Sequence, residues 1–299
     1  MPRKPSNSRQ LPPPVRSPTI SWFPPHMHHA YKRLAAEIAQ IDVVLEIRDA
    51  RLPLASGNPE LGRLVKGRKR LILFNKTSLA AVADTAAWKE YFRQTGLHTL
   101  FLDAAEGRGV NLIYPIIREI VAPGMETLRR RGIRPPPQRL MVAGIPNVGK
   151  STLINRMVHR KRLKTAPHPG VTRAVDWVML KKKYLLMDTP GLVLPRLDNP
   201  EEAMRLGWIG TIPDRAIGPE KLATALLAQL REKVPRPLAA HYGLGPDLPA
   251  GAEELLESIA GRRGLLRRGG APDTLRGAEQ VLVDFRAGRL GRVTLETPP

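Results

Sequence analysis

The chain has 299 residues, enough for about two domains with real cores, and its sequence contains no apolar run that approaches the ~18 residues of a membrane span. It has no cysteine, which excludes disulfide bonds and thiolate metal sites and fits a reducing compartment. Its formal net charge of +21 is tolerated best beside phosphates, so we expect a polyanionic partner, with nucleic acid as the first candidate.

The N-terminal segment 1–20 contains six prolines, four basic residues and no acidic residue. A segment of this composition cannot bury enough apolar surface to fold alone, which predicts a disordered basic arm. A mitochondrial transit peptide is also rich in arginine and poor in acids, but it forms an amphipathic helix that this proline density opposes. We therefore favour the arm over the transit peptide.

Three histidines, His26, His28 and His29, fall within four residues just before a predicted helix. A metal site is the less favoured interpretation, because no cysteine or paired acids nearby would complete it. A turn that presents one histidine to a ligand is the better functional hypothesis. A simple turn at the start of the helix is the structural alternative.

Strands and helices are predicted to alternate from residue 42 to residue 121. The predicted strands are 42–47, 71–74 and 99–102, and the predicted helices are 79–95 and 110–121. This alternation is typical of βαβ units with a parallel sheet, in which ligands bind at the carboxyl ends of the strands. Two polar stretches stand at such ends, and they are Asn75-Lys76-Thr77-Ser78 and Asp103-Ala104.

A stretch rich in proline and arginine, 123–138, is predicted to be a linker. After it, residues 144–151 match the P-loop pattern G-x-x-x-x-G-K-[ST]. A buried strand is predicted before the pattern, at 140–143, and a helix after it, at 151–158. This context favours a phosphate-binding loop over a chance glycine turn.

Each fixed position of the P-loop pattern has a physical task. Gly144 and Gly149 let the backbone bend so that its N–H groups face phosphate oxygens. Lys150 adds a cation, and the hydroxyl of Ser151 can bind Mg²⁺. The sequence therefore predicts a site for a nucleoside polyphosphate.

Downstream of the P-loop, residues 174–180 and 184–187 are predicted to form a hairpin whose second strand leads into Asp188. An acid at the end of an apolar strand after a P-loop is typical of the position that helps to hold Mg²⁺. Thr172 lies in the loop between the P-loop and Asp188, where it could close on the γ-phosphate and Mg²⁺ as a switch.

Basic residues are concentrated around the P-loop. The segment 129–183 contains fifteen lysines and arginines and one acid, Asp176. We expect a basic face beside the nucleotide site. An ordinary solvated basic surface is the alternative, although acids are usually interspersed on such surfaces.

Helical patterns dominate the last third of the chain, and helices are predicted at 201–210, 218–232, 252–260 and 274–287. The predicted division of the chain is a basic arm at 1–20, an α/β domain at 21–209 and a helical domain at 210–299. Contact with RNA and simple solvation both remain open for the arginines between the last two helices, which are Arg262, Arg263, Arg267 and Arg268.

The motifs occur in a rotated order. In ordinary GTPases the P-loop precedes the motifs N-K-x-D and S-A, whereas here Asn75-Lys76 and Asp103-Ala104 precede the P-loop. The chain thus resembles a circularly permuted GTPase, and within that class it resembles the ribosome biogenesis GTPase A family (YlqF-like), which includes mitochondrial relatives. The stretches that carry the resemblance are WFPPHM at 22–27, DARLP at 49–53, GIPNVGKST at 144–152, PGVTRA at 169–174, DTPG at 188–191 and DFRAGRLGRVTLE at 284–296.

The resemblance implies a fold and an activity. The fold is α/β: a circularly permuted P-loop GTPase domain, with a mostly parallel sheet flanked by helices, followed by a small helical C-terminal domain that helps to hold rRNA. The activity is GTP hydrolysis by a protein that binds the large ribosomal subunit or its rRNA and assists its late assembly, with hydrolysis stimulated by the particle. GTP or GDP, Mg²⁺ and K⁺ are the implied cofactors. We expect a monomer in the bacterial cytoplasm, with the mitochondrial matrix as the alternative.

The motifs and the resemblance together predict the site residues. Nucleotide binding is predicted for Asn75, Lys76, Thr77, Ser78, Asp103, Ala104, Asn147, Val148, Gly149, Lys150, Ser151, Thr152 and Gly191. Magnesium binding is predicted for Ser151, Thr172 and Asp188, and K⁺ binding for Asn147. Catalytic roles are predicted for Lys150 and His26.

Two positions depart from ordinary GTPases. Leu192 stands where Ras-like enzymes carry the glutamine that orients water, so hydrolysis by the protein alone is expected to be slow. The family resemblance implies that His26 supplies the orienting group when docking on the particle brings it into place. Ser78 stands where the guanine motif has aspartate, and losing that paired acceptor costs on the order of 1–3 kcal/mol of base discrimination.

Two alternatives therefore stay open. One is an rRNA-binding scaffold with a degenerate, weakly guanine-selective site, and the other is an ATP-using P-loop enzyme, which the basic charge opposes.

Overall fold

The computed structural model describes residues 38–158, 177–187 and 199–299. Several predicted features lie outside these residues: the basic arm, the turn with His26, the loop with Thr172, and the segment with Asp188, Gly191 and Leu192.

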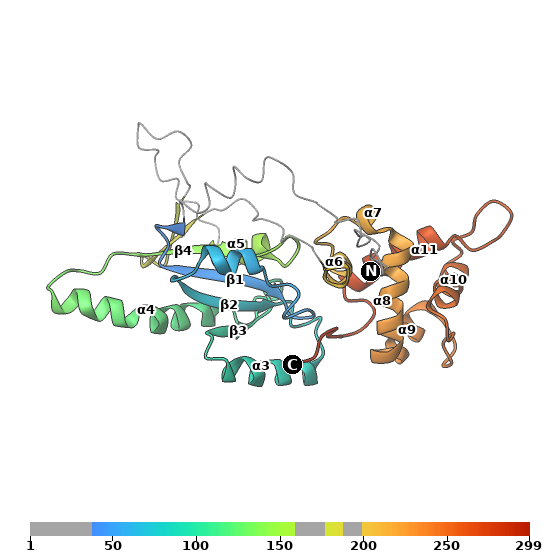
Figure 1. Ribbon diagram of the computed structural model, residues 1–299, viewed down its shortest axis with the longest axis horizontal. Coiled ribbons are helices and arrows are strands. Elements are labelled where there is room, and N and C mark those ends of the chain that lie inside the picture. Colours follow the sequence, from blue (N-terminus) through green and yellow to red (C-terminus); the bar gives the residue numbers. More distant parts are fainter. Residues whose placement is uncertain (1–37, 159–176, 188–198) are drawn as a thin grey trace, which may run out of the picture.

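A six-stranded sheet forms the centre of the first part of the chain (Figure 1). Its strands are β1 (Val43–Asp49), β2 (Lys69–Asn75), β3 (Thr99–Phe101), β4 (Gln138–Ala143), β5 (Trp177–Leu180) and β6 (Tyr184–Met187). The spatial order is β3-β2-β1-β4-β6-β5, and all neighbouring strands are parallel except β5 and β6, which form the predicted antiparallel pair.

The strand before the P-loop, β4, lies in the middle of this sheet. It pairs with β1 on one side, where Leu45 faces Val142, and with β6 on the other, where Met187 faces Met141. The strands that precede the P-loop in the chain thus lie on one side of β4 and those that follow it lie on the other. Although the motifs occur in a rotated order along the chain, their strands form one continuous sheet.

Helices cover both faces of the sheet, because the inner strands are apolar on both faces. In β2, Leu71 and Leu73 point into the cluster that includes α4 (Ile113–Arg130) and α5 (Lys150–Val158). The alternate residues Ile72 and Phe74 point the other way, onto Trp88 and Phe92 of α3 (Val82–Gln94). A short helix, α2 (Pro59–Leu64), covers β1 and β4 on the α3 face, and a 3₁₀ turn, η1 (Val110–Leu112), precedes α4.

The predicted linker at 123–138 is wrong in its first half, because α4 continues through Pro123 to Arg130. A proline inside a helix removes one hydrogen bond and clashes with the preceding turn, which is why a break is expected there. The residues after Pro123 nevertheless favour a helix, and Glu126 pairs with Arg129 at 3.7 Å and with Arg130 at 3.2 Å. Each exposed pair contributes only about 0.2–0.5 kcal/mol, and Met125 also packs against the core cluster, so both favour the helix after Pro123.

The last part of the described chain is helical. Its helices are α6 (Pro200–Trp208), α7 (Asp214–Ile217), α8 (Pro219–Lys233), α9 (Pro235–Tyr242), α10 (Ala252–Arg262) and α11 (Thr274–Arg286). The four predicted helices are confirmed as α6, α8, α10 and α11, whereas α7 and α9 were not predicted. Proline occupies the first position of α6, α8 and α9, where its missing N–H costs nothing.

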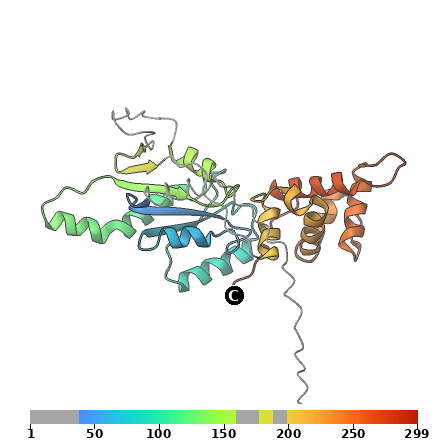
Figure 2. The same ribbon diagram turned by 45° about the horizontal axis from the view of Figure 1, so that its top comes forward.

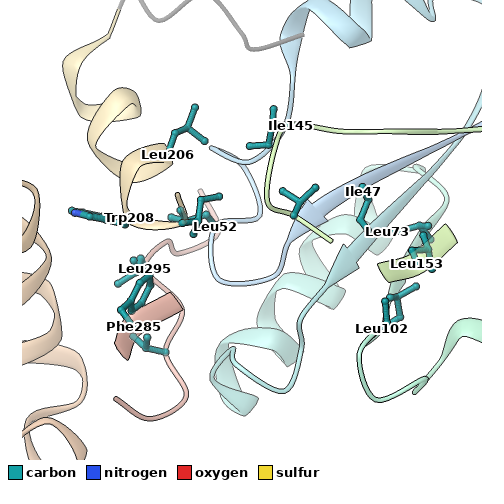
Figure 3. Close-up of a cluster of buried hydrophobic side chains, with 14 of the residues drawn as sticks. Ile47, Leu52, Leu73, Leu102, Ile145, Leu153, Leu206, Trp208, Phe285 and Leu295 are labelled. Atoms are coloured by element: carbon teal, nitrogen blue, oxygen red, sulfur yellow. The ribbon is translucent and has the colours of Figure 1, made fainter. Parts of the chain in front are cut away.

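The sheet and the helical part share one hydrophobic cluster (Figure 3). Leu52 and Ile145, from loops at the carboxyl ends of β1 and β4, pack into the same cluster as Trp208 and Phe285 of the helical part. Figure 2 shows the helical part beside this end of the sheet.

The chain then returns from α11 to the sheet, so that its C-terminus lies beside α3 (Figure 1). The N–H of Leu295 donates to the carbonyl of Arg51 at 2.9 Å, and the indole of Trp88 donates to the carbonyl of Glu296 at 3.3 Å. None of the helices in the described ranges is long and apolar enough to cross a membrane.

Candidate functional site

The loop between β4 and α5 has a backbone that only glycine fits at two positions. Gly144 and Gly149 have φ angles of 155° and 101°, a region that favours glycine. A Cβ on Gly144 would lie 2.5 Å from the carbonyl of Ile47, and a Cβ on Gly149 would collide with the side-chain amide of Asn75. The pattern glycines therefore allow neighbouring strand ends to approach the loop.

The loop leads into the N-terminus of α5, which Leu153 and Met157 anchor in the core. Ser151 and Thr152 are exposed in the first turn of this helix. A helix N-terminus presents unpaired N–H groups and a partial positive charge, which favours an anion. Hydroxyls and amides are thus available together at this end.

Lys150 is half-buried at the start of α5. Its Nζ donates to the carbonyl of Ile145 at 2.7 Å, and a lysine ammonium has two further protons to donate. Burial lowers the pKa of Lys150 to about 8. The side chain is thus oriented over the loop in a poorly solvated position.

Asn75 ties three loops together from the end of β2, where it is 2% exposed. Its Nδ2 donates to the carbonyl of Val148 in the P-loop at 2.8 Å. Its Oδ1 accepts from the N–H of Ala104, after β3, at 2.8 Å. One buried side chain thereby fixes the loops after β2, β3 and β4 relative to one another.

Lys76 makes a second link to the P-loop. Its Nζ donates to the carbonyl of Asn147 at 2.6 Å and lies 2.9 Å from Oδ2 of Asp49, at the end of β1. Arg51 also binds Asp49, through Nε at 3.0 Å and Nη2 at 2.9 Å. Burial raises the pKa of Asp49, but the two cations lower it by more, so that this carboxylate stays charged.

Ser78 and Asp103 also meet at this end of the sheet. The hydroxyl of Ser78 donates to Oδ2 of Asp103 at 2.5 Å, and the neighbouring Thr77 hydroxyl donates to the carbonyl of Leu102 at 3.1 Å. The structure therefore brings together the predicted residues from 75–78, 103–104 and 147–152. His26, Thr172, Asp188 and Gly191 lie outside the described residues.

A P-loop is thus joined by hydrogen bonds to the loops after β2 and β3, which precede it in the chain. Known proteins have similar sequences. Residues 139–217 match the profile of a family described as 50S ribosome-binding GTPase. A ribosome biogenesis GTPase A from Bacillus cereus is 36% identical over 279 residues, covering 93% of this chain and 94% of that protein. One from Bacillus pumilus is 34% identical over 94% of this chain and 99% of that protein. The chain belongs to the ribosome biogenesis GTPase A family.

Two further comparisons agree with this assignment. Mitochondrial ribosome-associated GTPase 1 from Xenopus tropicalis is 30% identical over 92% of this chain and 94% of that protein. The GNP-bound structure of YlqF from T. maritima has a TM-score of 0.65 at 23% identity, covering 90% of this chain and 98% of that one, and so has the same fold. The expected family and permuted GTPase fold are confirmed, and the protein is a GTPase of ribosome biogenesis.

Some residues at the site were not predicted from the sequence. Asp49 was not proposed for the site, although a polar residue at the carboxyl end of a buried strand was available as a signal. The helical part also reaches the P-loop: Thr211 Oγ1 donates to the carbonyl of Pro146 at 2.9 Å, and Asn147 Nδ2 donates to the carbonyl of Gly210. Nothing in the local sequence pattern indicates these contacts.

Proposed function

We propose that this GTPase binds GTP across the loops after β2, β3 and β4, and that it acts on the large ribosomal subunit during late assembly, with hydrolysis stimulated by the particle. The observation that carries the proposal is the double hydrogen bond of Asn75. It holds the P-loop at Val148 and the loop after β3 at Ala104, the segments that we propose for the phosphates and the base of the nucleotide.

The proposed phosphate contacts are the N–H groups of residues 147–152 and the ammonium of Lys150. Transfer of a phosphoryl group needs positioning and charge neutralisation rather than covalent chemistry, and both come from this loop. The base would lie between residues 75–78 and 103–104, and Gly191 is the remaining proposed contact.

The cation sites are proposals from the same loop. The exposed hydroxyl of Ser151 suits Mg²⁺, which prefers oxygen ligands, and β6 ends at Met187 beside β4, directly before Asp188 in the chain. Thr172 is the third proposed ligand. Bound Mg²⁺ would neutralise charge on the phosphates. Asn147, whose amide is oriented by its bond to Gly210, is the proposed ligand for K⁺.

The proposed water-orienting group is His26, since Leu192 has no hydrogen-bonding side chain. Docking on the particle would bring His26 to the γ-phosphate. Hydrolysis by the isolated protein is then slow, and the particle raises it.

The ribosomal partner is supported by charge and by the names of similar proteins. The net charge of +21 suits a polyanion. The matching family is described as 50S ribosome-binding, and the mitochondrial relative is described as ribosome-associated. Arg267 and Arg268 are exposed in the loop between α10 and α11, where they can meet rRNA phosphates. We place the protein in the bacterial cytoplasm, because bacterial relatives reach 36% identity and the mitochondrial ones 30%. We also propose that it is a monomer.

Nucleotide affinity is expected to fall as the pH rises from about 7 to about 9. Burial holds the pKa of Lys150 at about 8 in the free protein, whereas bound phosphates favour the charged lysine and raise its pKa. Binding therefore takes up a proton above pH 8, and affinity falls by up to about tenfold per pH unit. Calorimetric titration with GDP in buffers of different ionisation enthalpy measures this uptake.

The control for the pH effect is Lys150→Arg, since arginine stays charged over this range and should show no such proton uptake. Equal pH dependence in the two proteins would mean that another group titrates.

The function is tested by the rates of GTP, ATP and XTP hydrolysis in K⁺, with and without purified large ribosomal subunits. We expect GTP to be preferred, and the subunits to raise the rate at least about tenfold, which is 1.4 kcal/mol of barrier. Replacing K⁺ by Na⁺ should lower the rate. Absence of both subunit stimulation and nucleotide preference contradicts the proposal. Tight subunit binding without stimulation would favour the scaffold alternative, which Ser78 and Leu192 motivated.

A further inference from the structure

Ser78 and Asp103 meet across the loops that follow β2 and β3. The hydroxyl of Ser78 donates to Oδ2 of Asp103 at 2.5 Å, and the N–H of Ser78 donates to the same oxygen at 3.2 Å. Asp103 is 2% exposed, whereas Ser78 is only half-buried. Ser78 is therefore the member of the pair that a ligand can reach, and the carboxylate supports it from inside.

This arrangement fixes the direction of the Ser78 hydroxyl. Because its proton points at the carboxylate, the lone pairs of its oxygen remain to accept hydrogen bonds. A bond to a charged acceptor is stronger than a neutral one and polarises the hydroxyl, so that the oxygen accepts more strongly. A serine held in this way resembles, in part, the carboxylate that the guanine motif usually carries at position 78.

The carboxylate of Asp103 is itself firmly held. Its Oδ1 accepts from the N–H of Glu106 at 3.0 Å. Burial raises the pKa of Asp103, but hydrogen bonds from Ser78 and from the backbone of Glu106 and Ala105 lower it by more. The group is thus ionised at neutral pH and keeps a constant position. Glu106, the other carboxylate of this loop, pairs instead with Arg108 at the exposed rim.

We propose that the hydroxyl oxygen of Ser78 accepts hydrogen bonds from the N1–H and N2–H₂ edge of guanine. Asp103 does not contact the base; it is the positioning residue that directs the Ser78 hydroxyl. The proposal rests on the nucleotide site proposed above. It means that the negative charge absent from position 78 comes from the loop after β3, so that this chain keeps its preference for guanine without the usual aspartate.

The test is the ratio of the dissociation constants of IDP and GDP for the full chain, because inosine lacks the N2 amino group of guanine. The wild-type protein should bind GDP about tenfold more tightly than IDP. Asp103→Asn and Ser78→Ala should each bring the two affinities to within about twofold of each other. Glu106→Gln is the matched control, since it removes an exposed carboxylate from the same loop, and it should leave the ratio unchanged.

A double variant distinguishes loss of the hydrogen bond from misfolding of the single variants. In S78D/D103S the carboxylate and hydroxyl exchange places, so the preference for GDP over IDP should return. Equal weakening of GDP and IDP by Asp103→Asn, with an unchanged ratio, would show that Asp103 only braces the loop and would overturn the proposal. If the wild-type protein binds ADP as tightly as GDP, or binds neither, the proposed nucleotide site itself fails.

Discussion

Replacing Lys150 by alanine is expected to lower the rate of GTP hydrolysis about 100- to 1,000-fold, the range found when one preorganised donor is removed from a transition state. Lys150 is held over the P-loop by its bond to the carbonyl of Ile145 at 2.7 Å, which leaves two protons for phosphate oxygens. Its partial burial strengthens that attraction, because charges interact more strongly where water is excluded. Single-turnover hydrolysis, with GDP affinity measured separately, gives the effect on the chemical step.

The matched control for this variant is Lys182→Ala. Lys182 is exposed in the turn between β5 and β6, so its removal should leave the rate of the isolated protein within about twofold. A Lys150→Ala protein that hydrolyses GTP at the wild-type rate would show that the phosphates bind elsewhere.

The Arg51→Met protein is expected to lose about 3–5 kcal/mol of unfolding free energy, the cost of breaking a buried ion pair. Arg51 is 1% exposed and Asp49 is fully buried. The guanidinium binds both carboxylate oxygens, donates to the carbonyl of Phe285 at 3.0 Å and lies 4.6 Å from the centre of that ring. Methionine keeps much of the volume but removes one of the two cations beside Asp49, so that Lys76 and the backbone N–H of residue 51 remain as its partners. Chemical denaturation of the nucleotide-free protein measures the loss.

Arg93→Ala is the control for that measurement. Arg93 pairs with Glu90 on the exposed surface of α3, where ion pairs contribute about 0–1 kcal/mol. Should Arg51→Met prove no more destabilising than Arg93→Ala, the buried pair would not be the link that holds α11 to the end of β1.

Much of the fold could be predicted because its signals are local. The strands β1, β2 and β4 are buried on both faces, and each was visible in the sequence as a mainly apolar run, interrupted in β1 by Glu46. Parallel strands place their carboxyl ends at one edge, so polar residues at those ends were expected to converge. Ser78 and Asp103 do so, and Asn75 also binds the backbone N–H of Ala104.

The failures have physical reasons. Pro123 predicts a helix end from its own chemistry, but the helix continues to Arg130, with Met125 packed against the core and Glu126 paired with Arg130. The helices α7 and α9 are short, with 4 and 8 residues, and so give little periodic signal. Arg51 and Phe285 are 234 positions apart in the chain. Contacts between residues so far apart form only when the whole chain has folded. The link from Asp49 through Arg51 to Phe285 of the helical part was therefore not anticipated.

The most direct test of the account is a crystal structure of the full chain with a non-hydrolysable GTP analogue and Mg²⁺. The account predicts phosphates against the N–H groups of residues 147–152 and within reach of Lys150, with the guanine base between residues 75–78 and 103–104. A base bound away from Asn75 and Ala104, or phosphates bound at another loop, would contradict it.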